Sequence, residues 1–446
     1  MQRWNFLLQE AAKYDIIILG ASSDGDTRLL KTMLYQMKMG EHCDEFCKYL
    51  ACPMLQAGGV YVQDTIHIAT KLRNRLLKTS AKRFDKKKEQ KMILGQNEIT
   101  VEDLFSLVED LPISKHLLSK SDLDVRDKMN YKSVKKIITS NIINLLKERH
   151  AQATAYYLEM IQNCVTSYIS NDLTPMERIF KIWVAVFFFR VWRSYIKKSP
   201  NLKMDVFVSS NAYSCIEINA HAIVSLIRFL KQNNMPSAYF IPDLYSSQTC
   251  EFFFRIMRSM TSTPCTMVNF SILEILHRLK RLPVQNEIMN SEDEMHGFHF
   301  PSKKHVEYNE TAPLPNDPEI IAVIENAKQQ GATIFKDLNI VAIENDFLSQ
   351  IRRVETLEKK TRTRHDSNES DISDFDSETE ETDFEETPYN DPNGVEEISE
   401  VTLDISTVTV QDGNKTVEIK KSTYCWLLQN SNCHQSSDRL RRVIGK

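Results

Sequence analysis

Glycine and long apolar runs are scarce in this chain, and each shortage excludes a class of protein. Only 11 of the 446 residues are glycine, and no Gly-rich phosphate-binding loop of the Walker type occurs. The longest apolar run, residues 182–189, is far too short to cross a bilayer, so we expect no membrane partner. Residues 1–8 look like the start of an amphipathic helix rather than a signal peptide. Nine cysteines, an odd number, indicate a reducing compartment, either the cytosol or the nucleus.

Basic residues are missing from one long stretch near the C-terminus. Between Asp366 and Glu400 the chain has 15 acidic residues and no lysine or arginine. The net charge of -4 therefore conceals a remainder with 45 acidic against 56 basic side chains, which is +11. A basic body with an acidic stretch is common in proteins that meet nucleic acid, although the same division can serve solubility alone.

The N-terminal region alternates strands and helices, the pattern of an α/β protein. Residues 15–19 and 59–63 predict strands, and residues 27–37 and 67–78 predict helices. Two strands are too few for a stable parallel sheet. We therefore expect residues 1–91, which end in a charged connector, to be part of an α/β core. The rest of that core is either missing or comes later in the chain.

A long helical region follows the charged connector, from about residue 92. Thr174, Pro175 and Glu177 predict a helix that starts with a capping box. The helix that follows is apolar nearly all round, which predicts a buried central helix. Residues 221–231 predict another buried helix, and residues 252–260 and 270–281 predict two further helices.

The C-terminal third divides into three segments. Residues 291–360 predict a mixed linker region, with a modest strand and helix pattern around 320–351. The acidic segment 361–400 has too few large apolar groups to offset the entropy cost of ordering, so we expect it to be disordered. Residues 401–446 predict a small hairpin and helix module, because alternating residues at 401–410 and 416–419 flank a turn signal.

Carboxylates follow both predicted strands. Asp24 and Asp64 stand at the two strand ends, and Glu251 opens a much later helix. Carboxylates at strand ends, completed by a Glu on a helix, hold two Mg²⁺ ions in phosphoryl-transfer nucleases. Simpler explanations exist for each residue. Asp24-Gly-Asp26 can cap the next helix, and Asp64 can hydrogen-bond local backbone in a turn. Glu251 can stabilise a helix N-terminus.

A basic stripe follows Asp64. Helical spacing brings His67, Lys71, Asn74 and Lys78 to one face. Such a stripe beside an acidic site could hold a DNA backbone through its phosphates. A solvated helix face is the alternative explanation.

Four residues have the chemistry of zinc ligands: His42, Cys43, Cys47 and Cys52. They lack a second pair at ligand spacing, so buried thiols are the favoured interpretation.

Three blocks of sequence, Ser22–Asp26 followed by a helix, Asp64–Asn74 and Gln248–Ser259, occur in order with a long gap before the last. As an ordered set they resemble blocks of P-element-like transposases and their THAP-domain relatives. The resemblance covers roughly residues 1–290. It implies an RNase H-like core in two parts, residues 1–91 and 236–290, split by a large α-helical insertion at residues 92–235. Residues 421–423 and 437–440 also resemble segments of uncharacterised animal proteins of this type.

The resemblance also implies roles for residues. Asp24 matches the second member of the family's acidic triad and Glu251 the third, whereas Asp64 matches a block outside the triad. Only 23 residues precede Asp24, so we expect the first triad Asp and the first core strands to be missing through N-terminal truncation. Lys71, Arg73 and Lys78 would contact backbone phosphates.

These expectations combine into one hypothesis. The chain would be a transposase-derived nuclear protein with DNA as its partner, capable of self-association. Its Mg²⁺-dependent strand cleavage and transfer would be impaired, because removing an essential metal ligand costs many orders of rate. One alternative is a non-catalytic protein that binds nucleic acid or protein. Another is a GTP-binding remnant, since the insertion domain of P-element transposases binds GTP.

Overall fold

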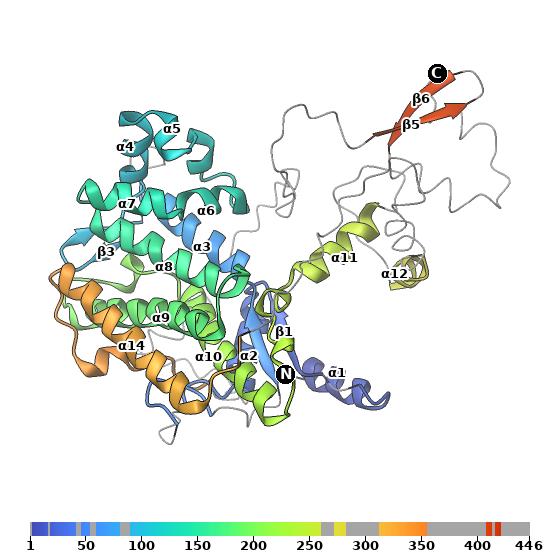
Figure 1. Ribbon diagram of the computed structural model, residues 1–446, viewed down its shortest axis with the longest axis horizontal. Coiled ribbons are helices and arrows are strands. Elements are labelled where there is room, and N and C mark those ends of the chain that lie inside the picture. Colours follow the sequence, from blue (N-terminus) through green and yellow to red (C-terminus); the bar gives the residue numbers. More distant parts are fainter. Residues whose placement is uncertain are drawn as a thin grey trace, which may run out of the picture. The chain divides into compact units, whose positions relative to one another are not determined.

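The computed structural model of the chain describes residues 2–16, 18–41, 46–53, 59–80, 90–259, 272–281, 312–354, 407–412 and 415–420. The described residues are mostly helical with few strands (Figure 1). The chain divides into a first unit, residues 1–247 and 308–382, and a second unit, residues 248–307 and 383–446. None of the described helices is long and apolar enough to cross a membrane.

The first unit holds most of the described elements. Its strands are β1 (Gly20–Ser23), β2 (Val60–Gln63), β3 (Ile93–Leu94) and β4 (Asn97–Glu98). Its α-helices are α1 (Gln2–Ala12), α2 (Thr27–Gln36), α3 (Thr65–Leu77), α4 (Glu102–Asp110), α5 (Ile113–His116), α6 (Tyr131–Ile137), α7 (Ser140–Glu148), α8 (Gln152–Ile169), α9 (Pro175–Lys198), α10 (Ser210–Gln232) and α14 (Asp317–Asp337). Its 3₁₀ helices are η2 (Lys120–Leu123), η3 (Met204–Val206), η4 (Ser237–Tyr239), η5 (Pro242–Leu244) and η6 (Glu344–Phe347).

The sheet that carries Asp24 and Asp64 has two strands in the described residues. β1 and β2 pair in parallel, with Gly20 opposite Val60 and Ser23 opposite Gln63. The strand predicted at residues 15–19 was wrong in position, because the chain pairs only from Gly20 and leaves Ile16 and Leu19 exposed. Gly20 explains this offset: a Cβ at this position would lie 1.8 Å from the Val60 carbonyl oxygen, so only glycine allows this approach.

Helix α10 closes the outer edge of β2. The Gln63 N–H donates to Asn219 Oδ1 (2.7 Å), and Asn219 Nδ2 donates to the Gln63 carbonyl (2.8 Å). One side-chain amide thus makes the pair of hydrogen bonds that a neighbouring strand would make. All four residues of β2 are buried as a result.

Helix α9 is the centre of the first unit, as its sequence predicts. Its capping box is confirmed, since Thr174 and Glu177 bond each other's backbone N–H groups and Pro175 occupies the first turn. Buried aromatic side chains line the helix and meet one another in edge-on and stacked pairs. Burying each such ring contributes about 1.5–3 kcal/mol. Helices α8, α10 and α14 pack around α9 (Figure 1).

A buried ion pair ties distant segments to α9. Arg190 and Glu217 are fully buried, and the guanidinium donates to both carboxylate oxygens at 2.7 and 2.6 Å. Its remaining nitrogen donates to the carbonyls of Tyr49 and Phe347 (2.9 Å each). Burial alone would raise the pKa of Glu217, but the charge and hydrogen bonds of Arg190, together with His221 and Tyr213, outweigh burial and lower it. One guanidinium therefore joins an early segment, two central helices and a late segment.

Domain boundaries differ from those predicted. The helices of 92–235 pack on α3 and β2 and belong to the same unit as residues 1–91. The linker predicted for 291–360 contains α14, a capped and half-buried helix that packs on α9. The first unit runs to residue 247, so α11 (Gln248–Ser259) belongs to the second unit.

The second unit has four described elements: α11, α12 (Ile272–Leu279), and the antiparallel strands β5 (Thr407–Asp412) and β6 (Lys415–Lys420). The two strands confirm the predicted hairpin, with Thr407 opposite Lys420. The acidic segment predicted to be disordered, 361–400, and the C-terminal residues 421–446 lie outside the described residues.

Candidate functional site

The loop after β1 is built around Gly25. Gly25 has φ +88°, a conformation that side chains rarely adopt, and it turns the chain from β1 into α2. Asp26 then caps α2, because its carboxylate accepts hydrogen bonds from the N–H groups of Arg28 and Leu29 (3.0 Å each). This confirms the capping role for Asp26. Asp24 is exposed at the end of β1, where one of its oxygens accepts from the Asp26 N–H (3.2 Å).

Two side chains from other helices hold this loop. Lys71 Nζ, on α3, donates to the Gly25 carbonyl at 3.0 Å and to Asn211 Oδ1 at 3.3 Å. Asn211, at the start of α10, donates to the same carbonyl at 3.0 Å. The ammonium group of Lys71, which was predicted to contact phosphate, is thus hydrogen-bonded to the loop that contains Asp24. The loop is preorganised by contacts from residues distant in sequence.

Asp64, at the end of β2, is nearly inaccessible. It is 1% exposed. Its Oδ1 accepts from the Ile66 N–H (2.8 Å), which caps α3, and its Oδ2 accepts from both the N–H and the hydroxyl of Ser247 (3.0 and 2.7 Å). The simpler explanation for Asp64 is therefore supported: it caps α3 and anchors the chain at Ser247.

Glu251 lies in the first turn of α11, in the second unit. Asp24 belongs to the first unit, so the two residues assigned to Mg²⁺ lie in different units of the chain. Within the first unit, Asp24 alone offers an exposed carboxylate at the described strand ends, since Asp64 is buried with both oxygens occupied. Two Mg²⁺ ions need several carboxylate and water oxygens at about 2.1 Å. These two aspartates therefore do not fit a two-metal site by themselves.

Arg73 is buried, contrary to its expected role as a phosphate contact. It is 0% exposed, and its two terminal nitrogens donate to the carbonyls of Asp122, Asp124 and Asp127 at 2.8–3.2 Å. Burial lowers the pKa of its guanidinium, against the opposing effect of these nearby aspartates. Arg73 thus fastens α3 to the loop that precedes α6, and in this conformation it has no access to a phosphate.

The other residues of the predicted stripe have mixed surroundings. Asn74 Nδ2 donates to the Lys128 carbonyl (2.8 Å), His67 is half-buried, and Lys78 is exposed at the end of α3. Of the three cations assigned to phosphates, Lys78 alone lies on the surface.

A polar row on α10 that the sequence analysis missed organises the strand ends. Asn211, Cys215 and Asn219 follow each other at intervals of four, so they share one face of a buried helix. Cys215 Sγ contacts Gln63 Oε1 (3.6 Å) and Asn211 Oδ1 (3.5 Å). Burial raises the pKa of Cys215 to about 12, so the thiol stays protonated. The asparagines at 211 and 219, which share one face of a largely apolar helix, were the sequence signal from which this row could have been predicted.

The proposed zinc ligands are only partly described. Cys47 and Cys52 are buried, and burial raises the pKa of the Cys47 thiol. His42 and Cys43 lie outside the described residues. The two described residues are consistent with buried thiols.

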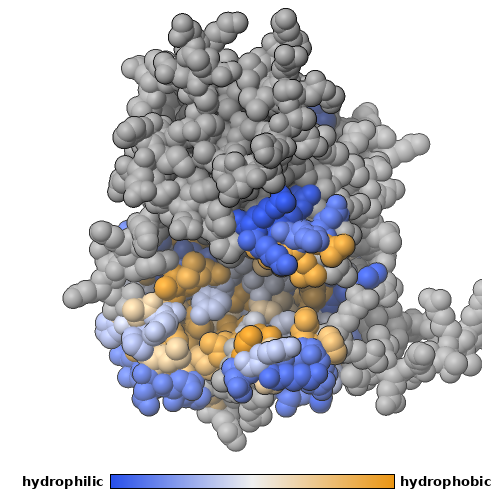
Figure 2. Space-filling view, turned by 90° about the vertical axis from the view of Figure 1, so that its right-hand side faces the viewer, coloured by the Kyte–Doolittle hydropathy of each residue, from blue (hydrophilic) through white to orange (hydrophobic). Residues whose placement is uncertain are grey.

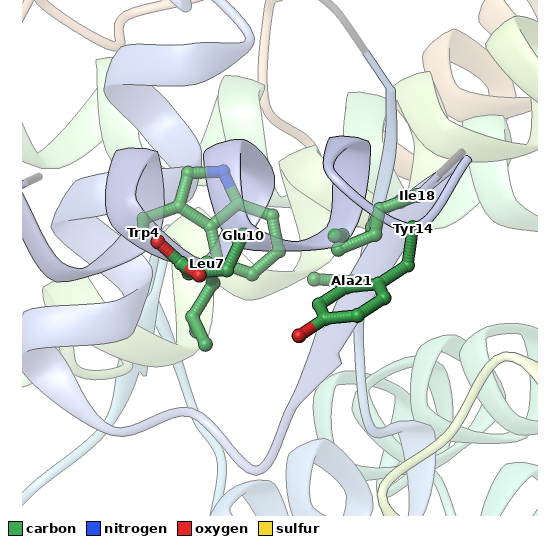
Figure 3. A pocket seen from close by; sticks show the side chains of 8 residues that line it. Trp4, Leu7, Glu10, Tyr14, Ile18 and Ala21 are labelled. Carbon is green, nitrogen blue, oxygen red and sulfur yellow. The ribbon is translucent and has the colours of Figure 1, made fainter. Parts of the chain in front are cut away.

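An open depression of about 470 Å³ lies between α1 and β1. Trp4 and Leu7 line one side of it, and Tyr14, Ile18 and Ala21 line the other (Figure 3). Figure 2 views the molecule from the right-hand side of Figure 1, and among its coloured residues apolar surface is bordered by hydrophilic side chains. The depression meets β1 at Gly20 and Ala21, at the opposite end of the strand from Asp24. It is therefore separate from the strand-end carboxylates.

Comparison of the chain with family models, with curated proteins and with solved structures finds no match in any of the three.

Proposed function

We propose that the chain is a transposase-derived nuclear protein with an RNase H-like core, which binds DNA without cutting it. The observation that supports the proposal most is the position of two aspartates at the ends of paired strands. Asp24 and Asp64 follow residues that are opposite each other in a parallel sheet, and only Asp24 is exposed. An acidic loop at the carboxyl end of a parallel strand is a usual position for a site in an α/β protein.

The occupied oxygens of Asp64 argue against its use as a metal ligand. Its three hydrogen bonds would have to break before it could bind a metal, and its burial opposes solvated ion entry. Were Mg²⁺ bound, Asp24 and Glu251 would be its ligands by resemblance. A bound ion would supply charge stabilisation for phosphoryl transfer. The proposal assigns no reaction step to these residues.

The charge balance supports DNA as the partner. Outside residues 366–400 the chain has 56 basic and 45 acidic side chains. A protein that neutralises phosphates releases condensed counterions, so its affinity falls steeply as salt rises.

The test combines a binding measurement with a cleavage measurement on the full chain. We expect DNA affinity to fall steeply with salt, and we expect no strand cleavage in Mg²⁺. Asp26→Asn is the matched control for Asp24→Asn, because it makes the same charge change and keeps a capping side chain. Mg²⁺-dependent cleavage that Asp24→Asn abolishes and Asp26→Asn spares would refute the loss of activity. Absence of DNA binding at low salt would refute the partner.

A further inference from the structure

The segment from Lys115 to Lys136 is rich in basic side chains. It contains seven lysines and arginines and three aspartates. Five of its six exposed lysines, here called the lysine surface, are Lys115, Lys120, Lys128, Lys132 and Lys135; the sixth, Lys136, is paired with Asp122. They lie on α5, η2, α6 and the loop that joins η2 to α6, all within the first unit.

Two of the three aspartates in this segment are neutralised internally. Asp122 is 5% exposed and accepts from Lys136 Nζ (3.0 Å) and from both the hydroxyl and N–H of Ser119. Burial opposes its ionisation, but these donors outweigh burial and lower the pKa of Asp122. Asp124 forms an ion pair with Arg126 at 2.7 Å. The excess positive charge is therefore left on the lysine surface.

The backbone beneath the lysine surface is fixed. Arg73 donates to the carbonyls of Asp122, Asp124 and Asp127, and Asn74 donates to that of Lys128. At the other end, Asn141 Nδ2 donates to the Lys115 carbonyl (2.5 Å). A rigid support lowers the entropy cost of binding, because only the side chains need to be ordered.

The α6 lysines occupy its outer face. Tyr131, Val134 and Ile137 are buried against the core, whereas Lys132 and Lys135 are exposed. Within the described part of the chain, the ammonium groups of Lys120, Lys128 and Lys132 make no ion pair. These three cations can therefore meet a ligand without breaking an existing bond.

We propose that the lysine surface binds the phosphodiester backbone of nucleic acid. This inference rests on the proposed function and names the surface that contacts DNA, in place of the inward-facing Lys71 and Arg73. Cations spread over a loop and a helix match a ligand with repeated single negative charges. Lysines bind such charges as point cations without base readout, so the contact is independent of sequence.

The experiment compares two triple variants of the full chain with the wild type. Lys120→Gln, Lys128→Gln and Lys132→Gln together remove three charges from the lysine surface. Lys38→Gln, Lys91→Gln and Lys203→Gln remove three exposed charges elsewhere in the first unit. The probe is a short DNA duplex of mixed sequence, titrated at several salt concentrations. Each lost phosphate contact lowers the slope of log affinity against log salt by about 0.9.

We expect the lysine-surface variant to lose about 2.7 from this slope and at least about tenfold in affinity near 0.1 M salt. The control variant should lose little of either. Replacing the same three lysines by arginine should retain the slope, and circular dichroism should give all variants the thermal midpoint of the wild type.

The outcomes separate this inference from the proposed function. If the wild type fails to bind DNA, both are refuted. If it binds with steep salt dependence and the two triple variants behave alike, the lysine surface is refuted while DNA binding stands. If the lysine surface mediates binding to vesicles of anionic lipid and not to the duplex, its ligand is a membrane and the inference is also refuted.

Discussion

Replacing Arg73 by methionine distinguishes an internal support from a phosphate ligand. The substitution keeps most of the apolar stem and removes the hydrogen bonds to three backbone carbonyls. The bond to the buried Asp122 carbonyl is worth about 2 kcal/mol, and the two partly solvated bonds about 1 kcal/mol each. Removing the buried Nε, which has no hydrogen-bond partner, stabilises the folded state by about 1 kcal/mol. We therefore expect the free energy of unfolding to fall by about 3 kcal/mol.

Urea unfolding of the full chain, followed by tryptophan fluorescence and by far-UV circular dichroism, measures this change. Lys78→Met is the control, because its side chain is exposed at the end of the same helix and should change stability by less than about 0.5 kcal/mol. Hydrogen exchange should show faster opening of residues 120–131 in the Arg73 variant. An unchanged urea midpoint combined with weaker DNA binding would refute the reasoning, since it would make Arg73 a surface ligand.

Three further predictions concern the strand ends and the core. Gly25→Ala forces a side chain to φ +88° and 2.6 Å from Lys71 Nζ, so it should cost about 1–2 kcal/mol in urea unfolding. Asn219→Leu leaves both polar backbone groups of Gln63 unbonded and should cost about 2–4 kcal/mol by the same measurement; a loss under about 0.5 kcal/mol would contradict the role of this amide. Burial lowers the pKa of His221 to about 4, so the unfolded chain binds its proton first. Stability should therefore fall by about 3 kcal/mol as pH falls from 7 to 4, and His221→Gln should remove much of that fall in urea midpoints measured across pH.

Local signals in the sequence predict the helix ends well. Thr174, Pro175 and Glu177 fix the start of α9, and Asp26 fixes the start of α2, because each cap is a bond between neighbours in the chain. The period of apolar residues likewise predicts that α9 and α10 are buried. These features depend on a few adjacent residues, so no knowledge of the tertiary structure is needed.

The sequence predicts the site less well, because partners distant in the chain determine it. The resemblance implies that Arg73 contacts phosphate, yet a loop about 50 residues later supplies the carbonyls that accept its hydrogen bonds. Asp64 has the position of a metal ligand, yet Ser247 occupies one of its oxygens. The apolar run at residues 16–19 predicts a buried strand, but the close approach that Gly20 permits shifts the pairing by several residues.

The packing of α14 on α9 has a consequence for the order in which the chain can fold during synthesis. About 120 residues separate the end of α9 from the start of α14, and the second unit begins within that interval. At a ribosomal rate of roughly 5–20 residues per second, α9 is synthesised about 6–24 s before α14, the helix that packs on its aromatic face. Phe347 and the last bond of Arg190 arrive later still. The nascent first unit therefore exposes the aromatic face of its central helix for many seconds, so it should depend on chaperone protection until residue 350 has left the ribosome.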